Sequence, residues 1–168
     1  MLALIFAMQA GSPAPPELAA ELRPLAFLTG SCWRITSPLN QTVDTHCYTV
    51  MPGGHSVRDV AVSAGGSDPY YGETIYRWDR RARRIRFEYY ASDGGYGWGF
   101  VDPTSDGLNF PGDHWVGGDG QRMRLRTVQT HQADSYTNSS FGLWPGQRRW
   151  RRLYTTRFTR TGPASAPR

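Results

Sequence analysis

Residues 27–35 read FLTGSCWRI, in which Gly30 and Trp33 lie three positions apart with Cys32 between them. The stretch follows a short run of helix-forming residues and opens the first strand-like segment of the chain. It raises the question of whether the chain begins a closed barrel that holds a ligand or an ordinary open sheet. The sequence on either side favours the barrel.

The composition indicates one all-β domain. The chain has 168 residues, which is enough for a single domain with a substantial core. Its 19 glycines and 12 prolines are spread along the chain, and 13% of its residues are aromatic. No long apolar segment has helical periodicity, so we expect many short strands joined by turns.

Turn signals recur at short intervals after residue 24. They are PGG at 52–54, AGGSD at 64–68, DRRA at 79–82, SDGG at 92–95, DPTSDG at 102–107, GGDG at 117–120 and PGQ at 145–147. The segments between them amount to about ten strands in chain order, the pattern of an up-and-down meander. Closure removes the exposed edges of so large a sheet. We therefore expect an antiparallel barrel over residues 24–160.

The N-terminal residues indicate export. Residues 1–10, MLALIFAMQA, are apolar and end in small residues, and we interpret them as the remnant of a signal peptide. A fortuitously apolar N-terminus is the alternative. Residues 11–23 combine a Pro/Ala-rich linker with a short helix that Pro24 ends, and residues 161–168 are expected to be a disordered tail. No segment is long enough to span a bilayer, so we expect a periplasmic or secreted protein without a stable membrane span.

Cys32 and Cys47 are expected to form a disulfide. If residues 38–41 form a four-residue hairpin loop, the two cysteines lie directly opposite each other. Pro38 favours this loop, because a two-residue turn would require its nitrogen to donate a hydrogen bond. The pair then occupies a non-hydrogen-bonded site, where Cα atoms approach to about 4.5 Å. A disulfide agrees with export, and two buried thiols are the alternative.

Three segments carry a family resemblance. LAFLTGSCW at 25–33, MPGGHSVRD at 51–59 and GETIYRWD at 72–79, within a ten-strand meander, resemble the calycin superfamily and most closely the bacterial lipocalin-like proteins of unknown function. The resemblance covers residues 24–160. It implies that Trp33 packs across the closed end of the barrel and that Arg152 or Arg157 of the last strand covers it. Lipocalins proper have one residue between the glycine and the tryptophan, whereas this chain has two.

The resemblance also bears on cofactors and metals. Haem-binding relatives in the superfamily hold iron through a histidine near the end of the chain, and here none follows His131, so we expect no cofactor. The four histidines have no spacing typical of metal ligands, so we expect no metal. His46 is the histidine expected to face the lumen, with an outward position as the alternative.

Aromatic and charged residues inside the strands are the candidate ligand-binding residues. If Glu73 faces the lumen, then so does Arg77, four positions on. Such a pair would anchor a polar group or carry acid–base chemistry, and a satisfied ion pair or a solvated outer face is the alternative. Gly97 and Gly99 indicate close approach of an aromatic ring or a ligand. The expected aromatic lining is Tyr48, Tyr71, Tyr76, Tyr89, Trp98, Trp115 and Tyr136.

The charge pattern does not favour a nucleic-acid partner. The net charge of +5 comes from arginine alone, because the chain has no lysine, which is typical of solvated basic positions filled by one residue type. Arginine and aromatic residues alternate at 80–90 and 148–154, as in proteins that bind single strands. Several of these arginines lie at a turn, where charge is readily solvated, so we expect no nucleic acid to bind.

The sequence thus predicts an exported lipocalin-like barrel that binds a small, largely apolar ligand. The first alternative is an isomerase, lyase or cyclase on the same barrel, using Glu73, Arg77 or His46. The second is a filled structural or interaction barrel. The lumen discriminates between them: a filled lumen excludes binding and catalysis, and an open lumen with a strongly shifted carboxylate pKa favours the enzyme.

Overall fold

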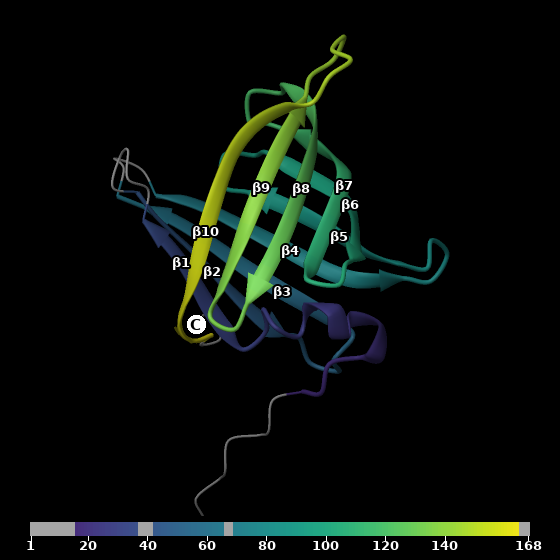
Figure 1. Ribbon diagram of the computed structural model, residues 1–168, viewed down its shortest axis with the longest axis vertical. Helices are drawn as coiled ribbons and strands as arrows, with labels where there is room; N and C mark the ends of the chain where they lie inside the picture. Colours follow the sequence, from purple (N-terminus) through teal and green to yellow (C-terminus); the bar gives the residue numbers. More distant parts are fainter. Residues whose placement is uncertain (1–15, 37–41, 66–68, 165–168) are drawn as a thin grey trace, which may run out of the picture.

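The computed structural model describes residues 16–36, 42–65 and 69–164. Within them, a short 3-10 helix precedes ten strands that form one closed antiparallel barrel (Figure 1), which confirms the predicted all-β meander. The elements are η1 (Ala20–Leu25), β1 (Ser31–Thr36), β2 (Val43–Val50), β3 (Ser56–Ala64), β4 (Tyr70–Asp79), β5 (Arg84–Ala91), β6 (Tyr96–Pro103), β7 (Gly107–Val116), β8 (Arg122–Gln132), β9 (Ser135–Leu143) and β10 (Arg151–Pro163).

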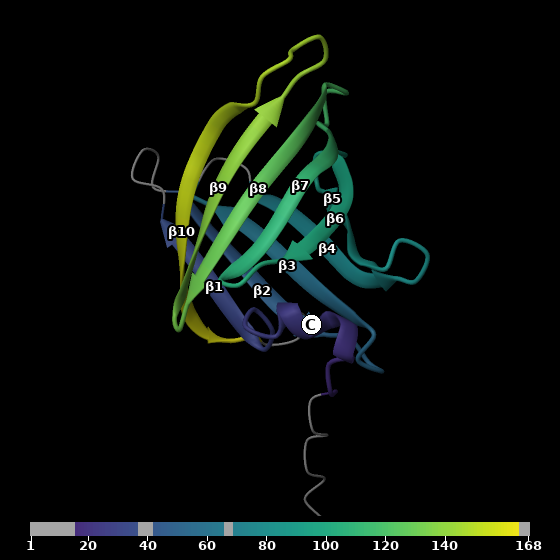
Figure 2. The same ribbon diagram turned by 45° about the vertical axis from the view of Figure 1, so that its right-hand side comes forward.

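Pairing between the first and last strands closes the barrel. Each strand pairs with the next along the chain, and β10 returns to pair with β1, where Trp33 lies opposite Arg160. Figures 1 and 2 both show β1 and β10 side by side. β10 continues to Pro163, three residues beyond the boundary expected at residue 160. Each of the ten described strands is therefore paired on both sides.

One end of the barrel is closed by η1, which lies across its lower end in both views (Figures 1 and 2). Leu22, Leu25 and Leu28 are fully buried there, together with Trp33 and Val57. Burying each leucine side chain stabilises the fold by roughly 1.5–3 kcal/mol. This end of the interior is therefore an apolar core.

The helix η1 tolerates a proline that was expected to end it. Leu22 N–H donates to the Ala19 carbonyl, and Ala26 N–H donates to the Arg23 carbonyl, at 2.9 Å each. Pro24 is the second residue of the turn that the Ala26–Arg23 hydrogen bond closes, so neither bond requires an N–H from it.

Trp33 is fixed at the closed end by two contacts. Its indole Nε1 donates to the Leu28 carbonyl at 3.1 Å, and the Arg160 guanidinium lies 4.5 Å from the ring centroid. Arg160 also donates to Ser31 Oγ at 2.7 Å. A cation over an indole face in this geometry is stabilising. These contacts join β1, β10 and the segment that follows η1.

The arginine over Trp33 is therefore Arg160, whereas the sequence analysis expected Arg152 or Arg157. Antiparallel register explains the difference: Arg152 lies opposite Phe141, near the other end of β10, and donates to Thr155. Arg157 donates to Gln132 and Ser135 instead.

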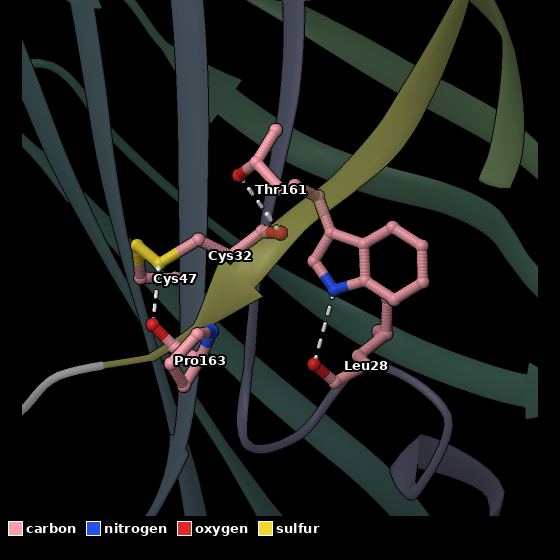
Figure 3. Close-up of a disulfide and its surroundings, with 6 residues drawn as sticks. Leu28, Cys32, Cys47, Thr161 and Pro163 are labelled. Atoms are coloured by element: carbon pink, nitrogen blue, oxygen red, sulfur yellow. Dashed lines mark hydrogen bonds between the residues drawn. A yellow bond between two sulfur atoms is a disulfide. The ribbon is translucent and has the colours of Figure 1, made fainter. Parts of the chain in front are cut away.

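The predicted disulfide is confirmed. Cys32 and Cys47 lie directly opposite each other on β1 and β2, with their Cα atoms 4.1 Å apart. Figure 3 shows the bridge beside the end of β10, where Thr161 Oγ1 donates to the Cys32 carbonyl at 3.3 Å. The loop expected at residues 38–41 lies outside the described residues. The bridge thus joins the first hairpin next to the strand pair that closes the barrel.

Replacing both cysteines by serine is expected to lower the free energy of unfolding by about 3 kcal/mol, since the bridge constrains a 15-residue segment of the unfolded chain. Urea unfolding under oxidising conditions measures the difference. Reductant should destabilise the wild-type protein by a similar amount and leave the double variant unchanged. Equal stability of the two proteins without reductant would contradict the prediction.

Candidate functional site

Strand register decides which side chains face the lumen. Tyr48 on β2 lies opposite Asp59 on β3, and Asp59 lies opposite Thr74 on β4. On the next pair, Tyr76 lies opposite Phe87 on β5. All of these side chains are buried, so this face of each strand is the inner one. A carboxylate consequently enters the barrel interior on β3.

The lumen contains a cavity of about 170 Å³ beyond the apolar core. Tyr48, Tyr76, Phe87 and Tyr136 belong both to the core and to the cavity wall, so they form its floor. An apolar cavity of about 150 Å³ holds benzene, so this one has room for a single ring with small substituents. The other lining residues are His46, Asp59, Thr74, Tyr89, Gly97, Phe110, Asp113, His114, Trp115, Leu125, Thr127, Gln129 and Asn138.

His46 and Asp59 form a hydrogen-bonded pair in the cavity wall. His46 Nδ1 lies 2.8 Å from Asp59 Oδ2, and the Asp59 side chain is only 3% exposed. Burial by itself lowers the pKa of His46, but the charge of Asp59 and the hydrogen bond outweigh it, so the pKa is raised. Nε2 of His46 has no hydrogen-bond partner among the described residues. The ring is thus oriented by a carboxylate and keeps one nitrogen for another group.

Three tyrosines surround Asp59. Burial raises the pKa of the Tyr48 and Tyr76 phenols well above its ordinary value, and the Asp59 charge raises it further. Burial also raises the pKa of Tyr136, which shares a hydrogen bond with Tyr48. All three phenols therefore stay protonated at neutral pH and can donate hydrogen bonds.

Asp113 is the second buried carboxyl group of the lumen. It lies where the β7–β8 register shifts, next to Pro111 and Gly112, and its exposed fraction is 5%. Burial, the largest cause, raises the pKa of Asp113 to about 8, although Arg124, the Phe100 N–H and Arg84 oppose the shift. The carboxyl group is thus largely protonated at neutral pH.

Glycines on β6 make room for these side chains. A Cβ atom at Gly99 would collide with the Asp113 carboxyl group, and one at Gly97 would lie 3.1 Å from the Trp115 ring. The close approach predicted for this glycine face is confirmed, with a ring at one position and a carboxyl group at the other.

Three buried oxygens of the cavity lining have no hydrogen-bond partner within the described part of the chain: Asp59 Oδ1, Asp113 Oδ1 and Gln129 Oε1. Gln129 uses its amide nitrogen to donate to Asn138 Oδ1 at 2.9 Å, which leaves the amide oxygen unpaired. A buried acceptor without a donor carries a desolvation penalty of roughly 1–3 kcal/mol. Unpaired polar groups therefore concentrate in this cavity.

The structure places five residues of the expected aromatic lining in the cavity wall, namely Tyr48, Tyr76, Tyr89, Trp115 and Tyr136. Tyr89 OH also lies 2.8 Å from Tyr70 OH. Aromatic character selected them, but it also selected Tyr71 and Trp98, which lie outside this cavity, because alternation alone does not say which face looks inward.

The other expected anchors lie on the outer face. Glu73 Oε2 accepts a hydrogen bond from Arg58 Nη2 at 2.6 Å, and Arg77 Nη2 forms an ion pair with Glu88 Oε1 at 3.7 Å. Tyr71 is 52% exposed. Glu73 and Arg77 share a face as expected, but the neighbouring Tyr76 faces inward, so period-two alternation turns them outward. They form the solvated surface pairs that were the alternative.

Trp98 also faces outward. It stacks on His114 with ring centroids 4.7 Å apart and lines an outer groove of about 430 Å³ with Arg122, Arg124 and Trp144. This groove is larger than the lumen cavity. We favour the lumen as the functional site because its walls hold unpaired buried polar atoms.

Sequence reasoning missed Asp59, Asp113 and Gln129. Asp59 lies in the strand SVRDVAV, on the same face as the buried Val57, so a charge in a valine-rich strand was an available signal. Asp113 follows Pro111 and Gly112, and that dipeptide marks a strand irregularity. Gln129 gave no signal in the sequence.

Two further observations concern metals and membranes. Across the described ranges, no group of three or more His, Cys, Asp or Glu residues is placed to hold a metal ion. The same ranges contain no helix that is long and apolar enough to cross a bilayer.

Neither a scan against protein-family models nor a search of curated proteins finds a match to this chain. The architecture, a closed ten-strand antiparallel barrel with an N-terminal 3-10 helix, is consistent with a lipocalin-like fold.

Replacing Asp113 by asparagine is expected to stabilise the protein at about pH 8 by a few kcal/mol, at about 1.4 kcal/mol per unit of pKa shift. The folded-state pKa of this acid is raised, so the wild-type free energy of unfolding falls as pH rises from about 4 to about 8. Asparagine cannot ionise, so the variant should not show this pH-dependent loss of stability. Urea unfolding across this pH range measures the effect.

The matched control is Asp119→Asn, in an exposed turn where the side-chain oxygen accepts from Gln121 N–H at 3.0 Å. This change should alter the stability by less than about 0.5 kcal/mol at any pH. Parallel stability curves for the wild-type protein and Asp113→Asn would contradict the assignment of a buried, protonated carboxyl group.

Proposed function

We propose that the protein binds a small molecule of about one ring in the barrel lumen. The observation that carries the proposal is the set of unpaired buried oxygens on Asp59, Asp113 and Gln129 around a cavity of about 170 Å³. Natural proteins leave few buried acceptors unpaired, and such exceptions call for an explanation. A ligand that donates to them supplies one.

The walls favour a flat, partly apolar ligand body. Phe87 and Phe110 pack edge to face with centroids 5.6 Å apart, and Tyr89 stacks on Trp115 at 5.0 Å. Leu125 completes an apolar wall. Binding sites of this kind combine apolar walls with a few polar anchors that orient the ligand. The ligand therefore has a ring held by aromatic side chains and polar groups directed at the anchors.

Export is part of the proposal. The Cys32–Cys47 bridge supports it, because disulfides persist in oxidising compartments such as the periplasm and the extracellular space. The apolar residues 1–10, which lie outside the described residues, fit an export signal. We place the chain among the exported lipocalin-like barrels on these grounds and on its closed ten-strand architecture.

Leu125→Trp is expected to abolish binding, because an indole at this wall position occupies much of the cavity. Native mass spectrometry of protein purified from the exported fraction without detergent measures it. The wild-type protein should carry an adduct that is lost on denaturation, and Leu125→Trp should not. The control is Val128→Trp on the same strand, where the native side chain is 37% exposed. Equal occupancy of all three proteins would contradict a lumen site.

A second candidate function is acid–base catalysis on the bound molecule. The His46–Asp59 pair favours it, since a histidine oriented by a carboxylate, with its second nitrogen unpaired, is the arrangement of a general base. The open lumen and the raised pKa of Asp113 were also the features expected of an enzyme.

This second function predicts exchange of a ligand C–H proton with solvent. Ligand recovered from protein incubated in D₂O should gain deuterium, and His46→Gln should slow this gain by about 100-fold or more. The rate should rise with pH through the raised pKa of His46, because the neutral imidazole is the base. If ligand recovered from the wild-type protein carries no deuterium, acid–base catalysis is contradicted and binding alone remains as the proposed function.

A further inference from the structure

Three buried oxygens of the lumen lack a partner among the described residues, and all three are acceptors once Asp113 is ionised. Asp59, Asp113 and Gln129 each leave one buried oxygen without a donor, and they come from β3 and from the neighbouring strands β7 and β8. The fully buried nitrogens without a partner among the described residues belong to Arg58 and Arg126, which are not part of the cavity lining. His46 Nε2, which lines the cavity, accepts a hydrogen bond when the ring is neutral. The lumen therefore calls for a ligand with several hydrogen-bond donors.

Two of these acceptors are carboxyl groups that face the same space. The charges of Asp59 and Asp113 both act on the Tyr76 phenol and raise its pKa, although burial has the larger effect. Tyr76 lines the floor of the cavity, so the two carboxyl groups flank one ring-sized volume. The charge of Asp59 would repel an anionic ligand, and a ligand with acceptors alone would leave the Asp59 and Gln129 oxygens unpaired.

The charges around Asp113 do not supply a matched partner for it. Arg124 on β8 and Arg84 on β5 attract its ionised form, and Asp102 on β6 opposes it. Arg84 is already engaged, with two hydrogen bonds to Asp102 at 2.8 and 2.7 Å. His46 on β2 pairs with Asp59 instead. A cation inside the lumen would provide the missing partner at short range.

The aromatic walls favour a cation as well. The faces of tyrosine, tryptophan and phenylalanine rings attract cations, and the attraction strengthens when the site is desolvated. Tyr76, Phe87, Phe110 and Trp115 all line the cavity. A flat cation can therefore contact ring faces and donate to the carboxyl groups at once.

We propose that the lumen takes a small organic cation with several N–H donors on a flat body, such as an amidinium or a protonated amino-heterocycle. Asp113 is its main counter-ion, and Asp59 and Gln129 accept its remaining donors. This inference rests on the proposed lumen-binding function and names the chemical class of its ligand. Binding converts Asp113 to the ionised form and releases its proton to solvent.

Calorimetric titration with three matched probes tests the ligand class. Benzamidinium is a donor-rich cation, benzamide is its neutral counterpart of the same shape, and benzoate is the anion. At about pH 9 benzamidinium should bind at least about tenfold more tightly than benzamide, and benzoate should not bind. Benzamide or benzoate binding as tightly as benzamidinium, or no binding of benzamidinium, overturns the proposal.

The pH dependence identifies the counter-ion. Affinity for benzamidinium should rise by about tenfold per pH unit below the pKa of Asp113, about 8, and level off above it, because one proton leaves on binding. Asp113→Asn should remove this rise and the preference over benzamide. Any remaining rise in affinity with pH in Asp113→Asn should have the midpoint of the His46 titration, because deprotonation of His46 also favours binding of a cation. An unchanged pH profile in Asp113→Asn overturns the role of Asp113.

Two controls keep the outcomes distinct. Asp119→Asn should bind all probes as the wild-type protein does, and thermal unfolding should show that Asp113→Asn is folded. The proposal that the lumen binds a ligand is tested separately, by native mass spectrometry. Equal adduct occupancy in the wild-type protein and Leu125→Trp would contradict it. An adduct that Leu125→Trp removes, together with weak benzamidinium binding, retains the lumen site and rejects a cationic ligand.

Discussion

The pairing of β1 with β10 is the constraint on which the rest of the structure depends. It turns a ten-strand meander into a closed surface and thereby fixes which face of every strand looks inward. Trp33, Arg160 and the Cys32–Cys47 bridge all lie at this junction or directly beside it. Because side chains alternate with period two, a shift of one residue would turn Asp59 outward and Glu73 inward. The polar cavity therefore exists because of this register.

The interior is divided between stability and function. Leucines from η1 and its neighbours pack into the core at one end, whereas the cavity beyond the tyrosine floor holds a carboxyl group whose ionised form burial disfavours. A protonated Asp113 without a matched partner lowers stability in the ligand-free protein. Strained or destabilising groups of this kind are commonly kept at binding sites, where a ligand compensates them. Apolar burial at the filled end stabilises the fold and offsets the destabilising effect of the buried carboxyl group in the cavity.

Much of the fold was predictable because its signals are local. Glycine and proline turns divided the chain into strands, and Pro38 with the spacing of Cys32 and Cys47 predicted a bridge that the structure contains. The lining tyrosines were selected as aromatic residues inside strands, and the outward Tyr71 was selected with them. Arg160 was missed because pairing between the two ends of the chain includes a register shift beside Trp33, and no local pattern encodes that shift.

The sequence by itself determined the all-β class, the order of the strands, the disulfide and the aromatic character of the lumen, since each depends on neighbouring residues or on period-two alternation. Tertiary structure alone decided that Glu73 and Arg77 face solvent while Asp59 and Asp113 face inward. It also decided that Gln129 and both carboxyl groups surround one cavity. Alternation assigns residues to two faces of a strand, and barrel closure is the physical event that makes one of those faces the interior.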